Sequence, residues 1–123
     1  MASLLLLTSV VCFSQPGGAK NLGQIDVKIV TGHIMDKLEP ALALNQDQKP
    51  QISDAVAEFL KQKIEILPLQ NTDPATYASK FNLLSGGMIS KFKTILLARQ
   101  MTTFLGLKPK AADTANVLRH LFY

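Results

Sequence analysis

The chain has 123 residues, of which 47% are apolar, 18% charged and 7% aromatic, with no Trp and one Cys. This length allows one domain, and the composition excludes a disordered chain and predicts an aliphatic core. The formal charge of +4 is uneven, because residues 21–73 carry eight acids and five bases whereas residues 74–112 carry six bases and no acid.

A short apolar run, Leu4–Val11, lies near the start of the chain. It is too short for a membrane span of roughly 20 residues but fits the apolar region of a secretory signal peptide. Cys12 and Ser14 are small residues at the −3 and −1 positions for cleavage after Ser14. No Lys or Arg precedes the run, so either the start lies upstream or the signal is atypical. A buried N-terminal helix and a lipoprotein acceptor at Cys12 are the alternatives.

We therefore expect a signal peptide over residues 1–14, a flexible N-terminus over residues 15–20 and a single helical domain over residues 21–123. The mature protein would be periplasmic or secreted. It would also lack a thiol, so its stability would come from the core without disulfides.

The first predicted helix covers Ile25–Leu38, where apolar residues recur with helical period. Pro40 is expected to end it. Gly32 in its middle suggests a close helix crossing, and His33 beside it is expected at the surface.

The stretch from Leu42 to Leu67 carries the strongest helical pattern. Asn45 can cap the helix, Gln48 can complete a capping box, and Leu44 can form a hydrophobic staple. Apolar residues then recur at three- and four-residue spacing, which predicts one buried face. These residues are Ile52, Ala55, Val56, Phe59, Leu60, Ile64 and Leu67.

A polar linker is expected over Leu69–Thr72, followed by a helix with Asp73 as N-cap and Pro74 at its first position. Ser85-Gly86-Gly87 predicts a kink or tight turn in this region, because two glycines strongly penalise a helix. A nucleotide-binding interpretation of the glycine pair is weak, since no strand precedes it.

Helical period resumes at Met88 and continues to Leu105, with a break at Leu96–Leu97 left open. Gly106 is expected to cap this helix. A last helix is predicted from Ala111 to His120. The pattern thus predicts an all-α fold, a small bundle of four to five amphipathic helices.

Leu44 to Gln48 and Leu96 to Gln100 both read Leu-x-x-x-Gln. This pair resembles the LTxxQ motif that occurs twice in the Spy-like periplasmic helical proteins of Gram-negative bacteria. In that family the second motif residue caps a helix, a role that Asn45 fits and Leu97 cannot fill. The resemblance implies a curved, dimeric, chaperone-like protein. The chain departs from the family through Gly86-Gly87, Pro68 and a more apolar second half.

No catalytic constellation is visible, so we expect a protein that is not an enzyme and needs no cofactor. His33 and His120 are solitary, without the neighbours that a metal site requires. Asp54 and Glu58 lie one helical turn apart and could bind a cation, but solvated carboxylates are the simpler interpretation.

Two functional classes remain. In the first, the protein is an interaction module with an apolar groove for a protein or peptide partner, and in the second it docks on anionic envelope lipid or polysaccharide. Nucleic acid is not expected for an exported protein. The candidate groove residues are Tyr77, Phe81, Met88, Phe92 and Met101, with simple core as the alternative interpretation. The candidate anion-facing residues are Lys80, Lys91, Lys93 and Arg99, with solvated surface charges as the alternative.

Overall fold

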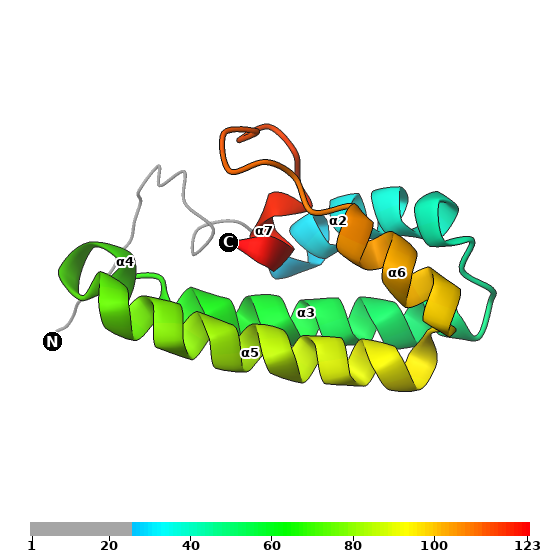
Figure 1. The fold of residues 1–123 in the computed structure, drawn as a ribbon, viewed down its shortest axis with the longest axis horizontal. Helices are drawn as coiled ribbons and strands as arrows, with labels where there is room; N and C mark the ends of the chain where they lie inside the picture. The colour runs from blue at the N-terminus through cyan, green and yellow to red at the C-terminus, as the bar shows by residue number, and fades with distance from the viewer. Residues whose placement is uncertain (1–25) are drawn as a thin grey trace, which may run out of the picture.

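The computed structural model describes residues 26–123, and this part of the chain is all helix and loop, as predicted. Its helices run along the chain as α2 (Val27–Leu42), α3 (Gln48–Ile66), α4 (Leu69–Thr72), α5 (Pro74–Ile95), α6 (Ala98–Gly106) and α7 (Arg119–Phe122) (Figure 1). The expected signal peptide and flexible N-terminus lie outside the described residues. None of these helices has the length and hydropathy that a membrane crossing requires.

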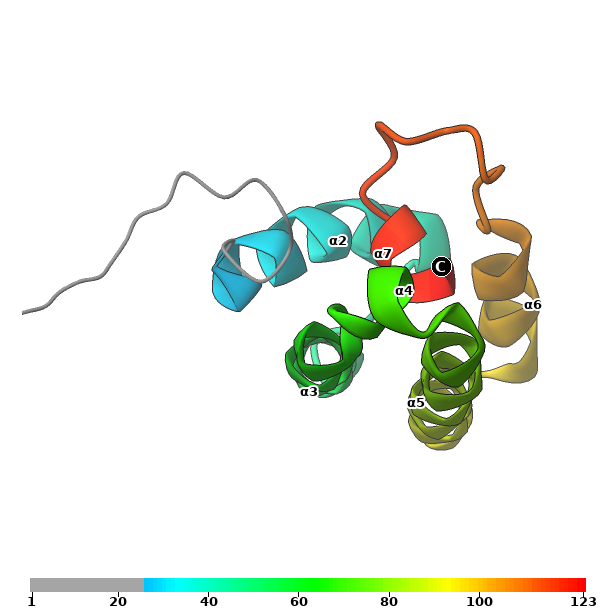
Figure 2. The same cartoon turned by 90° about the vertical axis from the view of Figure 1, so that its left-hand side faces the viewer.

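The helices form two layers. One layer is the antiparallel pair α3 and α5, joined by the short α4, and the other is built from α2, α6 and α7 (Figures 1 and 2). Seen along the pair in Figure 2, α7 sits between α2 and α6. The core therefore lies where the apolar stripes of the two layers meet.

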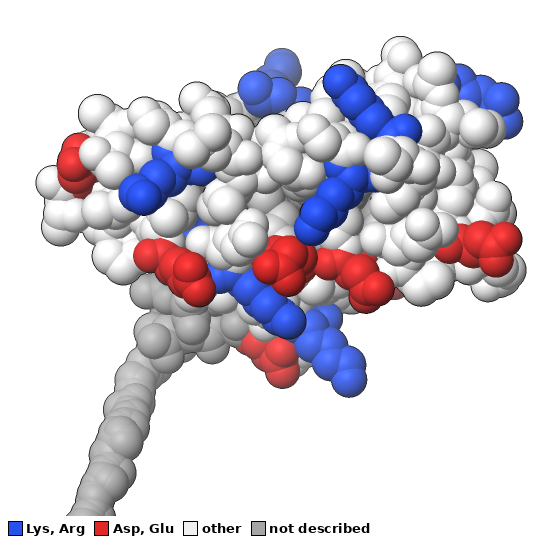
Figure 3. Space-filling view, turned by 90° about the horizontal axis from the view of Figure 1, so that it is seen from below, with Lys and Arg blue, Asp and Glu red and all other residues white. Residues whose placement is uncertain are grey.

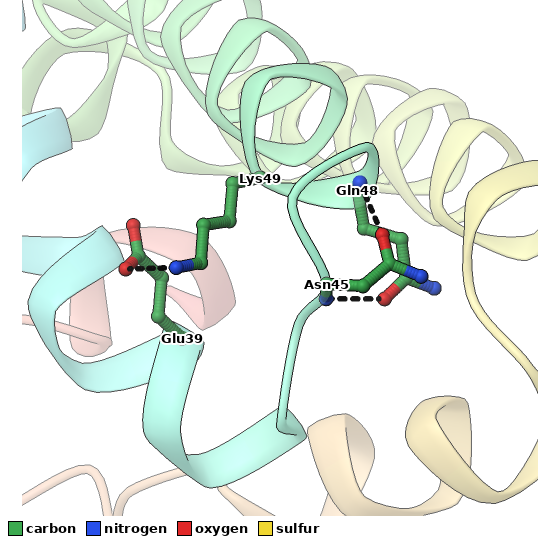
Figure 4. A network of polar contacts seen from close by, with 4 residues as sticks. All are labelled: Glu39, Asn45, Gln48 and Lys49. Atoms are coloured by element: carbon green, nitrogen blue, oxygen red, sulfur yellow. Dashed lines mark hydrogen bonds and ion pairs between the residues drawn. The ribbon is translucent and has the colours of Figure 1, made fainter.

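The start of α3 confirms the predicted capping box. The Asn45 side chain accepts from the Gln48 amide at 2.8 Å, and the Gln48 side chain accepts from the Asn45 amide at 3.1 Å (Figure 4). The next residue, Lys49, forms an ion pair with Glu39 of α2 at 3.7 Å. The predicted apolar stripe is buried as far as Leu60. These contacts fix both the first residue of α3 and the face that it turns inward.

Pro40 does not end the first helix, so that prediction is wrong. Helix α2 continues through it to Leu42, which is buried and anchors the last turn to the core. The chain then turns at Ala43, which has a left-handed φ of 51°, and the amides of Ala43 and Leu44 bond back to the carbonyls of Pro40 and Glu39. This is a Schellman-type end with Ala where glycine is the easier choice.

The break predicted at Ser85-Gly86-Gly87 is also wrong, because α5 runs unbroken through the glycines. Its start is well capped, since Asp73 accepts from the Thr76 amide at 3.2 Å and from the Thr76 hydroxyl at 2.6 Å. Phe81, Met88 and Phe92, on both sides of the glycines, are buried. This packing outweighs the local penalty of about 1 kcal/mol per glycine.

Gly86→Ala should stabilise the protein by about 1 kcal/mol, because a methyl group at this exposed position would meet nothing within 4 Å and alanine favours the helix. Urea unfolding measures the change. The reverse substitution at an exposed alanine of the same helix, Ala78→Gly, should cost a similar amount. A loss of stability in Gly86→Ala would contradict an undistorted helix at this point.

The last part of the chain differs most from its prediction. The helix expected over Ala111–His120 is wrong, since residues 107–118 form turns and only α7 is helical. The Tyr123 hydroxyl donates to the Pro109 carbonyl at 2.9 Å. The Lys108 ammonium and the Arg119 guanidinium lie 5.1 and 5.0 Å from the centre of the Tyr123 ring. The polar linker expected over Leu69–Thr72 is α4, and Gly106 is the last residue of α6 rather than a left-handed cap.

Two buried glutamines join the layers at one end. Gln48 and Gln100 donate to each other's side-chain oxygen, at 2.9 and 3.1 Å. Gln48 also donates to the Ile95 carbonyl at 3.0 Å, and Gln100 to the Leu42 carbonyl at 2.9 Å. Gln100 accepts from the Leu97 amide at 2.8 Å, although the Leu97 side chain cannot return a bond. The two Leu-x-x-x-Gln segments therefore meet, each linking the end of one helix to the start of the next.

Candidate functional site

The residues predicted to line an apolar groove lie mostly inside the protein. Phe81, Met88, Phe92 and Met101 are buried, and Tyr77 is half-buried. Phe92 makes an edge contact with Phe104 of α6 at 4.9 Å between ring centres. This set is therefore mainly core, although Met88 also lines a hollow between α3 and α5.

An open groove does lie elsewhere, between the outer sides of α3 and α5. It consists of two adjoining hollows of about 470 and 200 Å³ that share Ala55, Glu58, Gln62 and Lys91. We call it the α3–α5 groove. Besides the shared residues it is lined by Gln51, Asp54, Phe59, Leu83, Leu84, Gly87, Met88, Thr94 and Ile95.

The two ends of the α3–α5 groove differ in chemistry. The smaller hollow is mainly apolar, with Phe59 and Met88 on its floor and Leu83 on its edge. Leu83 is 77% exposed, the highest value among the large exposed hydrophobic residues of the described chain. Gly87 lines the same hollow, and a Cβ there would meet nothing within 4 Å. Because Gly87 has no side chain, a shallow depression remains beside the exposed Leu83, and we call it the shelf at Gly87.

The larger hollow is polar and carries more negative than positive charge. Asp54 and Glu58 line it from α3, with Lys91 from α5. Among residues 26–123 neither carboxylate forms an ion pair, since Lys49 to Glu39 is the one pair found there. Figure 3 looks onto this face, where acidic side chains form a row with basic ones both above and below it. Both carboxylates are therefore free to meet a cation.

The four predicted anion-facing residues are exposed but do not form one face. Lys80 and Lys91 are eleven residues apart on α5, close to three full turns, so they share a side of the helix. Lys93 points the opposite way, because two residues turn a helix by about 200°. Arg99 lies on the first turn of α6. The basic surface is divided between the groove edge and the α5–α6 corner.

A buried lysine that sequence analysis did not single out holds the C-terminal helix. Lys63 is 3% exposed, and its ammonium donates to the backbone oxygens of His120 at 2.7 Å and Tyr123 at 2.6 Å. Burial, and after it the charge of Arg119, lower the pKa of Lys63 from 10.5 to about 8. Burial, with the charges of Lys63 and Arg119, also lowers the pKa of His120.

This cluster of basic groups holds the C-terminal helix against α3. The Lys63 amine is enclosed. No group of three or more His, Cys, Asp or Glu residues in the described chain is placed to hold a metal ion. His33 is exposed and His120 is half-buried against α3.

Two of these features carried a signal in the sequence. Lys63 lies three and four residues after Leu60 and Phe59, which places it on the buried stripe of α3. Gln48 and Gln100 end two copies of one short motif, and repetition itself favours a shared role. The exposure of Leu83 had no such signal in the sequence, because it depends on which apolar helix faces pack against each other in the fold.

The chain was compared with protein-family models, with curated proteins and with solved structures, and none of the three comparisons finds a match.

Proposed function

We propose that this chain is an exported, non-enzymatic interaction module of the chaperone-like kind, which holds a protein or peptide partner along the α3–α5 groove. The observation that carries the proposal is the exposed Leu83 beside the shelf at Gly87, above a floor of Phe59 and Met88. Apolar surface next to a concavity is typical of binding sites for other molecules. The repeated Leu-x-x-x-Gln segments and the apolar run at residues 4–11 favour a periplasmic or secreted location.

A dye that fluoresces on apolar surfaces should bind the folded protein at this groove. Gly87→Leu fills the shelf and should lower the dye signal severalfold, because the new side chain occupies the hollow. Gly86→Leu is the matched control, since Gly86 is exposed but does not line the groove. A folded wild-type protein that leaves the dye dark would refute the proposal.

A second function is docking on an anionic surface through the α5–α6 corner. Leu97 is 52% exposed at this corner, and the exposed Lys93 and Arg99 lie four residues before it and two residues after it in the sequence. This combination suits a layer of anionic lipid headgroups.

Vesicles containing anionic lipid should then bind the protein at low salt and release it steeply towards physiological salt. Lys93→Gln with Arg99→Gln should weaken binding about thirtyfold, at roughly 1 kcal/mol per cation. Lys61→Gln with Lys108→Gln removes the same charge elsewhere and is the control. Binding that does not respond to salt would count against docking by these charges.

A further inference from the structure

The α3–α5 groove has a shape suited to a third helix. Its lining runs from Gln51 to Gln62 on α3 and from Leu83 to Ile95 on α5, so each wall is roughly 17 Å long, or about three helical turns. Both walls are helices whose backbone groups bond within themselves. An extended peptide would find no free strand edge there, whereas a helix satisfies its own backbone.

The shelf at Gly87 supports the same occupant. Helices that pack at the usual 8–10 Å separation need small residues where their side chains would otherwise collide. Gly87 disfavours the helical conformation of α5, and a Cβ at this position would meet nothing within 4 Å in the described chain. Its missing side chain would let an apolar residue of a third helix rest between Leu83 and Phe59.

The charges define the chemistry of that helix. The groove presents Asp54 and Glu58, one turn apart, against the single ammonium of Lys91 on the opposite wall. Neither acid is paired within residues 26–123. A partner with lysine or arginine at matching one-turn spacing would complement them, while an acidic partner would be repelled.

Resting on the proposed function, we infer that the occupant of the α3–α5 groove is a cationic amphipathic helix of another protein, with its apolar stripe over Leu83 and Gly87 and its basic side chains towards Asp54 and Glu58.

The test uses two synthetic helical peptides of about 18 residues with the same Leu and Ala stripe, one with Lys and one with Glu on the polar face. Isothermal titration against the full chain measures binding. At low salt the Lys peptide should bind at least about tenfold more tightly than the Glu peptide. Asp54→Asn with Glu58→Gln should reduce this preference to about threefold or less. Asp36→Asn with Glu65→Gln changes the net charge equally outside the groove and should leave it intact.

Gly87→Leu should abolish binding of the Lys peptide and Gly86→Leu should not, with circular dichroism showing that both variants fold. Equal binding of the two peptides, or no binding of either while the dye still binds at the groove, overturns the inference and leaves the proposed function standing. If the folded wild-type protein binds neither the dye nor either peptide, the inference and the proposed function are both refuted. A wild-type dimer that Gly87→Leu dissociates would show that a second copy occupies the groove, which also overturns the inference.

Discussion

Gln100→Ala should destabilise the protein by about 3 kcal/mol. The substitution leaves the Leu42 carbonyl and the Leu97 amide without their partner and removes one half of the buried pair with Gln48. Each buried polar group left without a partner costs about 1–3 kcal/mol. The midpoint of thermal unfolding should fall by more than about 10 °C, at roughly 4–8 °C per kcal/mol for a domain of this size.

Two further variants make that result specific. Gln51→Ala removes an exposed glutamine of α3, whose one side-chain bond is to the Asp47 carbonyl, and should change stability by less than about 0.5 kcal/mol. Gln48→Ala combined with Gln100→Ala should cost less than the two single changes added together, because each single change already breaks the shared bonds. Strictly additive costs would mean that the two amides do not act as a pair.

The free energy of unfolding should rise by about 2 kcal/mol between about pH 7.5 and about pH 9.5 because of Lys63. The folded state releases the Lys63 proton near pKa 8, whereas the unfolded chain holds it up to about 10.5. Between these values the unfolded state binds more protons, so raising the pH favours folding. The neutral amine keeps two N–H groups for the backbone oxygens of His120 and Tyr123.

The measurement is urea unfolding at several pH values, for the wild type and for Lys63→Met. The variant lacks the titrating amine, so its stability should stay nearly flat over this range. Burial raises the pKa of Tyr77, which lowers stability as the pH passes 10, so the comparison stops at about pH 9.5. Parallel curves for the two proteins would show that the Lys63 pKa is not lowered in the fold.

The sequence predicted best where the signals are local. The start of α3 depends on Asn45 and Gln48, three residues apart, and the start of α5 on Asp73 and Thr76. Both caps were predicted at the correct residues, and the all-α class follows from the same periodic patterns. Backbone and nearby side chains alone set these features, so neighbouring sequence is sufficient to find them.

Predictions failed where distant packing decides. Two glycines would break an isolated helix, but α5 is held straight by buried residues on either side of them. Phe81 and Phe92 were candidates for a groove, but Phe81 packs against Phe59 of α3 and Phe92 packs against Phe104 of α6. Lys63 binds residues 57 and 60 positions away, and the paired glutamines are 52 apart. Periodicity shows that a face is apolar, but it does not show what covers that face.

Helices α3 and α5 are connected at both ends, and this affects how a partner could bind between them. At one end Gln48 bonds directly to the Ile95 carbonyl, and at the other the short α4 joins the helices. Both helices run unbroken between these ends, so the two walls of the groove are held side by side. A flexible partner peptide would have to become helical on binding. The conformational entropy that it loses would then limit the affinity.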